Sequence, residues 1–380
     1  MGLPELTRNA VDVLPDGGLA TKLAQGRPLR VKLGIDVTAP DVTLGNGIPL
    51  QRMAAFQQEG HTGVLIVGDY TTRIGDPSGR SAARPVLSDE EIDANAARFL
   101  DQASAIIDPR RTEVRFNGEW LAKLDFAEIL RLTRVATVAR LLERDDFSRR
   151  FAEGSPISVS ELLYPLMQAY DSVAVEADVE LGGTDQLYNL LMGREVMEAY
   201  GLDPQVALTV EYLVSWDGQG MGASRGNYIG LKMAPEEQFG RAMRISDEQL
   251  AQWYRLVMEA EPPAGDPLED KLALARFIVG RSHGEEAADS AERHFTRVVR
   301  ERQAPADLPD TPLPEGDPVH LPALLASAFG ITTSEARRLI SQGGVRVNGE
   351  PTSELDLPRS TLEGALVQAG KRRYARLTAT

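Results

Sequence analysis

The stretch GIDVTAPDVTLGNGIPL, residues 34–50, joins the end of a predicted strand to the start of a predicted helix. The strand is the apolar run VKLGI, residues 31–35, and the helix begins near the Leu-Gly-Asn-Gly of residues 44–47. A glycine-containing loop that leads into a helix N-terminus commonly binds phosphate, because backbone N–H groups there point at the ligand. The stretch therefore predicts a nucleotide site, although it contains no His or Lys residue that would balance phosphate charge.

The segments around this stretch alternate between strand and helix patterns. Strands are predicted within TGVLIVGD (62–69), TEVRFNGEW (112–120) and ADVELGGTDQ (177–186). Helices are predicted over residues 88–107, where Ser88 and Glu91 form a capping box, and over residues 158–175. Alternating strands and helices, with ligand-type loops at the strand ends, predict an α/β fold with a doubly wound parallel sheet.

The pattern changes after residue 230, and four parts of the chain are expected. Residues 1–230 form the sheet domain, and residues 231–303 have only helical periodicity. Residues 304–317 are rich in Pro and Asp, which is typical of a linker. Residues 318–380 read as two short helices followed by a β-rich piece, which predicts a small α+β module.

Composition restricts the class of protein. The chain has 380 residues, no cysteine and four scattered histidines, so disulfides, thiolate metal sites and a His-rich zinc site are not expected. It has neither a signal-peptide pattern nor an apolar run long enough to span a membrane, so we expect a cytoplasmic protein without a membrane partner. The net charge of −15 disfavours nonspecific nucleic-acid binding, but EARRLI and GKRRYAR near the C-terminus are locally basic.

Several motifs, taken together and in order, resemble the bacterial type of tyrosyl-tRNA synthetase, a class I aminoacyl-tRNA synthetase. The strongest are YPLMQAYD (164–171) and LGGTDQLYN (181–189), and GDPSGRS, FNGEWL and NYIGL add to them. The C-terminal SEARRLI and QGGVRVNGE resemble the RNA-binding module of ribosomal protein S-four. The resemblance implies a Rossmann-like domain with a dimerisation insertion, a helical anticodon-binding-like domain and an RNA-binding module.

The resemblance also implies the ligands and partners. They are L-tyrosine or an analogue, ATP with its Mg²⁺ or an adenylate, and tRNA, with no metal held by the protein itself. The family pairs through the segment that corresponds to residues 135–147, so a homodimer is expected. In the C-terminal module, RNA phosphates would contact basic side chains: Arg337, Arg338, Arg346, Lys371, Arg372 and Arg373.

The tyrosine pocket can be placed on one helix. Tyr164, Gln168 and Asp171 are spaced i, i+4 and i+7, so one helix face carries a phenol, an amide and a carboxylate. By resemblance, Asp171 accepts the substrate's phenolic hydroxyl, which is how such a site rejects phenylalanine. The ammonium group would be held by Tyr164, Gln168 and Asp76, and the carboxylate would lie near Gln186. Lys32 stands where some family members carry a pocket tyrosine, so it is also expected to bind the substrate tyrosine.

The nucleotide positions follow from the same resemblance. Asp185 would hold the ribose, and Arg80 and Arg84 would close on the pyrophosphate. The remaining nucleotide-binding positions are Gly34, Asp36, Gly45, Gly182, Gly183 and Met221. The residues expected to take part in catalysis are Thr38, Thr43, Asn46, Arg80, Arg84 and Gln186.

Two catalytic signatures of the family are altered in this chain. The His-x-Gly-His tetrapeptide is Thr43-Leu44-Gly45-Asn46, and Lys-Met-Ser-Lys-Ser is Gly-Met-Gly-Ala-Ser at residues 220–224. Both sets of side chains stabilise charge that develops on the phosphates during activation. Because one lost donor costs about a hundred- to a thousandfold in rate, we expect tyrosine activation to fall by roughly four orders of magnitude or more.

Three hypotheses follow. The first is a repurposed paralogue that binds tyrosine, activates it poorly, and serves a non-tRNA acceptor or acts as a noncatalytic binder. The second is a working tyrosine–tRNA ligase that compensates with Arg80, Arg84 and Arg225. The third is an RNA-binding protein with a vestigial pocket. Tyrosine binding and tyrosine-dependent ATP–pyrophosphate exchange distinguish the three.

Overall fold

The computed structural model describes residues 2–74, 87–262, 265–300, 308, 310–370 and 373–378; for residues 224, 299 and 300 it describes the backbone only. The chain divides into two compact units. One contains residues 1–234 and 241–274, and the other contains residues 235–240 and 275–380. The division passes through two helices, α11 (Pro235–Ala242) and α13 (Pro267–His283).

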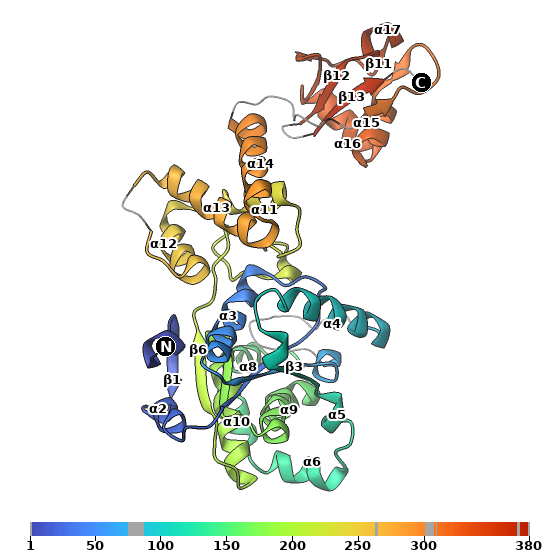
Figure 1. Ribbon diagram of the computed structural model, residues 1–380. Coiled ribbons are helices and arrows are strands. Elements are labelled where there is room, and N and C mark those ends of the chain that lie inside the picture. Colours follow the sequence, from blue (N-terminus) through green and yellow to red (C-terminus); the bar gives the residue numbers. More distant parts are fainter. Residues whose placement is uncertain are drawn as a thin grey trace. The chain divides into compact units, whose positions relative to one another are not determined.

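The first unit is built on a six-stranded sheet (Figure 1). Its strands are β1 (Ala10–Leu14), β2 (Arg30–Ile35), β3 (Thr62–Val67), β4 (Thr112–Phe116), β5 (Val179–Gly183) and β6 (Val206–Val210). The order is β1-β6-β5-β2-β3-β4, and only β1 is antiparallel to its neighbour. Strand order reverses between β2 and β5, so the predicted doubly wound sheet is confirmed and its crevice lies beside β2.

The helices of this unit connect the strands and cover the sheet. They are α1 (Leu3–Leu6), α2 (Gly18–Leu23), α3 (Leu44–Gln58), α4 (Asp89–Ala103), α5 (Gly118–Leu121), α6 (Phe126–Thr133), α7 (Val138–Leu141), α8 (Asp145–Ala152), α9 (Val159–Val175), α10 (Leu187–Ala199) and α12 (Leu250–Trp253). Short 3₁₀ turns occur at η1 (Thr71–Arg73), η2 (Pro109–Arg111), η3 (Thr184–Gln186), η4 (Ala223–Arg225) and η5 (Asp247–Gln249), and a π turn at η6 (Tyr254–Met258). Helices α9 and α10 pack side by side (Figure 1).

Strand β3 is buried on both faces because helices cover both sides of the sheet. Val64 and Ile66 pack with Val175 at the end of α9. On the other face, Gly63 faces α3 so closely that a Cβ there would lie 2.8 Å from Met53 Sδ. A glycine at this position therefore lets α3 approach the sheet, and its N-terminus reaches the crevice.

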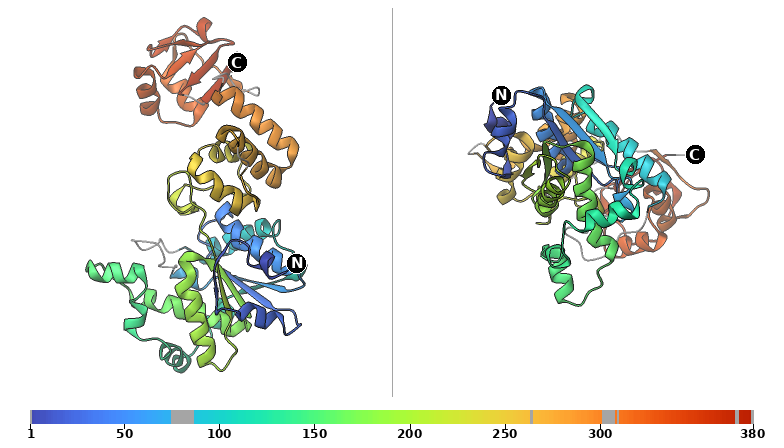
Figure 2. Two further views of the ribbon diagram at one scale, coloured as in Figure 1. Left: turned by 90° about the vertical axis from the view of Figure 1, so that its left-hand side faces the viewer. Right: turned by 90° about the horizontal axis from the view of Figure 1, so that it is seen from below.

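The segment of residues 126–147 forms three short helices, α6, α7 and the start of α8. The break after α6 is capped locally, since the Thr137 side chain accepts a hydrogen bond from the Arg140 N–H. These helices extend away from the sheet in both views of Figure 2. The capping box predicted at Ser88 and Glu91 is present at the start of α4.

The second unit contains helices and a small β-rich part. Its helices are α14 (Glu285–Phe295), α15 (Leu321–Phe329), α16 (Thr333–Ser341) and α17 (Arg359–Leu362), with parts of α11 and α13 and a π turn at η7 (Thr296–Arg300). Its strands are β7 (Asp310–Pro312), β8 (Val319–His320), β9 (Val345–Val347), β10 (Glu350–Pro351), β11 (Asp356–Leu357), β12 (Leu366–Ala369) and β13 (Arg373–Thr378).

Five of these strands form a sheet in the order β10-β9-β12-β13-β7, and β8 pairs with β11. Apolar residues of α15, α16 and the sheet form one buried core between residues 313 and 377. Strand β7 lies inside the predicted linker of residues 304–317 and pairs in parallel with β13. The sequence interpretation of residues 310–312 as linker is therefore wrong, because a short strand with two prolines at its borders lacks a strand-like sequence pattern.

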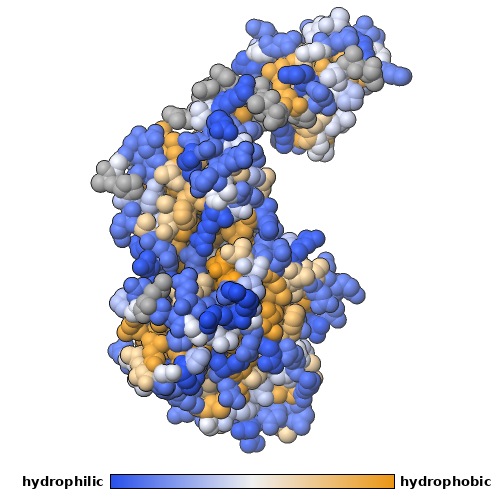
Figure 3. All heavy atoms as spheres, in the orientation of Figure 1, coloured by the Kyte–Doolittle hydropathy of each residue, from blue (hydrophilic) through white to orange (hydrophobic). Residues whose placement is uncertain are grey.

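The visible face of the molecule is mostly hydrophilic, with hydrophobic residues in smaller groups between (Figure 3). Within the described parts of the chain, no helix combines the length and the apolar character needed to cross a bilayer.

Candidate active site

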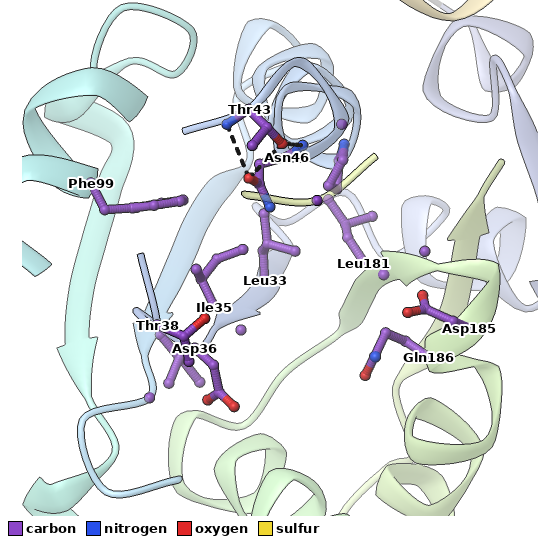
Figure 4. Close-up of a pocket in the computed structure, with 18 of the residues that line it drawn as sticks. Leu33, Ile35, Asp36, Thr38, Thr43, Asn46, Phe99, Leu181, Asp185 and Gln186 are labelled. Atoms are coloured by element: carbon purple, nitrogen blue, oxygen red, sulfur yellow. Dashed lines mark hydrogen bonds between the residues drawn. The ribbon is translucent and has the colours of Figure 1, made fainter. Parts of the chain in front are cut away.

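A pocket opens at the carboxyl ends of β2, β5 and β6, beside the N-terminus of α3 (Figure 4). One helix, α9, contributes polar side chains to it. Most of the positions predicted from the sequence line this pocket: Gly34, Asp36, Thr38, Thr43, Gly45, Asn46, Tyr164, Gln168, Asp171, Gly182, Gly183, Asp185, Gln186 and Met221. The fold thus gathers residues from four distant segments at one edge of the sheet, where open α/β sheets bind ligands.

Asp171 lies at the inner end of the pocket and is almost fully buried. The Trp120 indole donates a hydrogen bond to its Oδ1 at 2.8 Å, and the Asn117 amide donates to its Oδ2 at 3.3 Å. Burial raises the pKa of Asp171 to about 7, against the opposing effect of the Lys32 ammonium and these two donors. The carboxyl group therefore titrates near neutral pH, where its ionised form can accept a phenolic hydroxyl.

Tyr164 and Gln168 lie on the same face of α9 as Asp171. The Tyr164 hydroxyl donates to Asp36 Oδ2 at 2.9 Å, and Asp36 Oδ1 accepts from the Thr71 hydroxyl. The Gln168 amide donates to Glu180 at 3.2 Å. These bonds fix the helix face against the end of β2 and against β5, so its polar groups are held in place by the fold.

Asn189 on α10 connects two of the predicted substrate positions. Its buried amide donates to Gln168 Oε1 and to Gln186 Oε1, both at 3.0 Å. The Arg144 guanidinium in turn donates to Asn189 Oδ1 at 3.2 Å. Sequence reasoning missed Asn189, Asn117 and Trp120, although all three lie in stretches it had singled out, because their spacing does not reveal the partners.

Lys32 does not line the pocket. Its side chain is fully buried beneath α9, and its Nζ lies 2.8 Å from Glu180 Oε1. The same ammonium donates to the Ser172 hydroxyl and to the Gln168 carbonyl. The geometry therefore does not support the predicted direct contact between Lys32 and tyrosine.

The side of the pocket where the sequence predicts the ribose is formed by the turn after β5. Asp185 and Gln186 lie on η3, across the pocket from Asp36 and Thr38 (Figure 4). A Cβ at Gly182 would lie 2.9 Å from Gln186 Cβ, and one at Gly183 would lie 2.7 Å from Asp185 Oδ1. A side chain at either position would therefore require the side chain of Gln186 or Asp185 to shift.

The side where the sequence predicts the phosphates is formed by the start of α3. Thr43 is the N-cap of this helix, and its hydroxyl accepts a hydrogen bond from the Asn46 N–H. Asn46 Oδ1 accepts hydrogen bonds from the Thr43 N–H at 3.1 Å and from the Thr43 hydroxyl at 2.8 Å (Figure 4). The two residues that replace histidines are therefore bonded to each other in a capping box.

The second altered signature faces this helix end. Met221, Gly222 and Ala223 line the pocket, and a Cβ at Gly45 would lie 3.6 Å from Met221 Cβ. The Tyr212 ring lies against Gly220 where a side chain would begin, so a lysine there would need this ring to move. Arg225 is exposed outside the pocket lining, and its guanidinium donates to the Gly220 carbonyl at 3.0 Å.

The described lining is acidic. It contains five carboxylates and no Lys, Arg or His side chain; the carboxylates are Asp36, Asp41, Asp171, Asp185 and Glu211. In the described part of the chain no cluster of three His, Cys, Asp or Glu side chains could hold a metal ion. Asp76, Arg80 and Arg84, which the sequence assigned to the ammonium group and the pyrophosphate, lie outside the described residues.

The predicted RNA-binding arginines lie on several elements of the C-terminal module. Arg337 and Arg338 are exposed on α16, and Arg373, at the start of β13, pairs with Glu335 of the same helix at 3.2 Å. Arg346 lies between buried Val345 and Val347, so it points away from the core. Lys371 and Arg372 lie outside the described residues.

Comparisons with known proteins cover nearly the whole chain. The family model of class I tRNA synthetases for Trp and Tyr matches residues 24–300, and the S4 domain model matches residues 321–355. The tyrosine–tRNA ligase of Moorella thermoacetica is 47% identical over 390 residues, which covers 98% of this chain and 94% of that protein. The tyrosine–tRNA ligase of Thermotoga maritima is 42% identical over 386 residues, or 98% and 96% of the two chains.

Solved structures give the same fold. A truncated mitochondrial tyrosyl-tRNA synthetase of Aspergillus nidulans matches with a TM-score of 0.63 and 22% identity, over 78% of this chain and 93% of that one. The enzyme of Archaeoglobus fulgidus, solved with L-tyrosine, matches with a TM-score of 0.61 and 21% identity, over 77% and 98%.

Proposed function

Since this chain belongs to the bacterial tyrosyl-tRNA synthetase family of class I synthetases, we propose that it binds L-tyrosine, activates it with ATP and transfers it to tRNA. We further propose that activation is slow. The observation that carries the substrate is the buried Asp171, ordered by Trp120 and Asn117 at the inner end of the pocket. The similarity to tyrosine–tRNA ligases along the full chain supports this reading over a non-tRNA acceptor.

The chain's own residues account for amino-acid recognition. The Asp171 carboxylate accepts the phenolic hydroxyl, and a substrate without that hydroxyl leaves the buried carboxylate poorly compensated. Gln168 and Tyr164 line the same pocket and lie where the tyrosine ammonium group would bind. Gln186, held by Asn189, lies on the side where the carboxylate meets the nucleotide.

The nucleotide end accounts for slow activation. The N-terminus of α3 offers backbone N–H groups, and its partial positive charge favours phosphate. The described lining adds carboxylates instead of basic side chains, so the charge that develops on the phosphates is poorly balanced. ATP would bring its own Mg²⁺, which supplies part of the missing positive charge.

A specific observation favours a second candidate function. Thr43 and Asn46 bond to each other, and Gly222 and Ala223 have no side-chain donors, so both altered signatures offer fewer groups to a phosphate than histidines and lysines would. In this second reading the chain binds tyrosine and does not activate it at a useful rate.

Three measurements on one preparation test these readings. Tyrosine binding by calorimetry tests the pocket, tyrosine-dependent ATP–pyrophosphate exchange tests activation, and charging of tRNA with tyrosine tests the whole reaction. We expect tyrosine binding, pyrophosphate exchange and charging of tRNA to be detected. Exchange should be at least about a hundredfold slower than in a family member with both signatures intact. Binding without exchange would leave the second candidate, and RNA binding without tyrosine binding would leave a vestigial pocket.

A homodimer is part of the proposal. Four large apolar residues, on α6, α7 and α8 and at the first position of α9, are more than 60% exposed: Phe126, Val138, Phe151 and Val159. Solvent-exposed apolar groups of this size on neighbouring helices are typical of an interface. Sedimentation should give a dimer at micromolar concentration, and Phe151→Asp should shift it toward monomer.

The C-terminal module is proposed to bind tRNA. Exposed Arg337, Arg338 and Arg346 would contact phosphates, so their substitution by Gln should weaken tRNA binding and lower its dependence on salt. The control is Arg359→Gln, which removes an arginine bonded to the Pro314 carbonyl within the same module.

A further inference from the structure

Lys32 and Glu180 form an ion pair beneath the pocket. They lie opposite each other on the neighbouring strands β2 and β5, and their side chains are 0% and 1% exposed. The ammonium and carboxylate are 2.8 Å apart. Taking both charges out of water is costly, so such a pair adds little stability compared with apolar side chains of the same size. A role in orienting other groups would explain a pair in this position.

The pair is bonded to α9 on both sides of Asp171. Lys32 Nζ donates to the Gln168 carbonyl at 2.9 Å and to the Ser172 hydroxyl at 2.7 Å. Glu180 accepts from the Gln168 amide and from the Ser172 hydroxyl, both at 3.2 Å. The helix residues immediately around Asp171 are thus held by one buried pair of opposite charges.

The hydrogen-bond donors and charged groups around Asp171 come from several elements. Trp120 and Asn117 donate hydrogen bonds to it, Lys32 approaches from β2 and Glu180 from β5. The ammonium favours the ionised carboxyl group and the second carboxylate disfavours it. Neither member of the pair lines the pocket, so neither is placed to touch the substrate.

We propose that Lys32 and Glu180 are positioning residues for tyrosine recognition: they fix the face of α9 that carries Gln168 and Asp171, and they set the charge that Asp171 presents to the substrate. This inference rests on the proposed tyrosine binding. It makes the ion pair a determinant of selectivity for the phenolic hydroxyl, acting through Asp171.

Titration of Asp171 tests the inference without a substrate. In protein labelled with ¹³C-aspartate, the Asp171 carboxyl signal is assigned by its loss in Asp171→Asn, and its pH titration is followed by NMR. Lys32→Met should raise the pKa of Asp171 because a favourable charge is lost, whereas Glu180→Gln should lower it. A purely structural pair would destabilise the fold in both variants without shifting this titration in opposite directions.

Two further variants keep the test decisive. Lys22→Met removes another buried ammonium group, whose Nζ lies 2.6 Å from Asp203 Oδ2, and should leave the Asp171 titration unchanged. If Lys32→Met fails to fold, the double variant Lys32→Met/Glu180→Met removes both charges and replaces a buried pair by apolar groups. The pKa of Asp171 in this double variant should lie above that in Glu180→Gln, because the favourable charge of Lys32 is lost. Shifts of the same sign in both single variants, or none, would overturn the inference.

Calorimetry with tyrosine and phenylalanine supplies the functional readout. In Lys32→Met, Asp171 should be protonated at pH 7, so the phenolic hydroxyl loses its hydrogen bond to a charged carboxylate. Tyrosine binding should therefore weaken by roughly ten- to a hundredfold, and phenylalanine binding should change less. Equal losses for both amino acids would contradict the role in selectivity. If the unaltered protein binds no tyrosine, the proposed function fails, while the NMR titration still decides whether the pair controls Asp171.

Discussion

The two ends of the pocket are built differently. At the tyrosine end, Asp171 and Gln168 are held by hydrogen bonds to buried neighbours. At the phosphate end, Thr43 and Asn46 bond to each other, and the opposite wall contains Gly222 and Ala223. Under the proposed function, recognition of the amino acid and stabilisation of phosphate charge would use separate groups, so the first can be complete while the second is weak.

The largest expected effect is a gain at the phosphate end. Ala223→Lys places an ammonium in the pocket lining, and restoring one donor should raise tyrosine-dependent pyrophosphate exchange by about a hundred- to a thousandfold. The control Ala251→Lys adds the same charge at an exposed position on α12 and should have no effect. An unchanged exchange rate in Ala223→Lys would show that the missing donors do not limit activation.

The next effect is a loss at the tyrosine end. Asp171→Asn removes the charged acceptor, so tyrosine affinity should fall by roughly ten- to a hundredfold and approach the affinity for phenylalanine. Asp93→Asn, on the exposed side of α4, is the matched control. Retention of tyrosine selectivity by Asp171→Asn in calorimetry would remove Asp171 from the recognition site.

Tyrosine affinity should depend on pH. Because the pKa of Asp171 is raised to about 7, the ionised fraction of this carboxyl group increases about tenfold from pH 6 to pH 8. Tyrosine affinity should rise by about as much, since the ionised form accepts the phenolic hydroxyl. Stability changes in the opposite sense. Binding of a proton to Asp171 in the folded state stabilises the fold. This stabilisation is fully present below the ordinary aspartate pKa and is lost as the pH rises through about 7.

Calorimetry and thermal unfolding at both pH values measure these two trends. Asp171→Asn should abolish the pH dependence of affinity in this range and flatten that of stability. The assignment to Asp171 would be wrong if the variant kept the slope of the unaltered protein.

The smallest effect concerns Asn189. Asn189→Ala removes two hydrogen bonds, to Gln168 and Gln186, and should weaken tyrosine binding by about five- to tenfold. Ser88→Ala removes the cap of α4 and should cost about 1 kcal/mol of stability without affecting binding. Similar binding losses in the two variants would mean that Asn189 acts only through general stability.

The sheet could be predicted from local patterns of strand and helix residues, whereas most of the pocket positions were predicted from the resemblance to the synthetase family. The strand ends and the i, i+4, i+7 spacing of Tyr164, Gln168 and Asp171 can be read along the chain. The pairing of Lys32 with Glu180 cannot, since 148 residues separate them and only the β2–β5 register brings them together. The mutual bonding of Thr43 and Asn46 also depends on backbone geometry at the start of α3.

The most direct test of the account is one paired measurement on the unaltered protein: tyrosine affinity by calorimetry and tyrosine-dependent ATP–pyrophosphate exchange, beside a family member with both signatures intact. We expect the two proteins to have comparable tyrosine affinity and selectivity over phenylalanine, and we expect exchange by this protein to be slower by at least about a hundredfold. Exchange at the rate of that relative, or no selective binding of tyrosine, would contradict it.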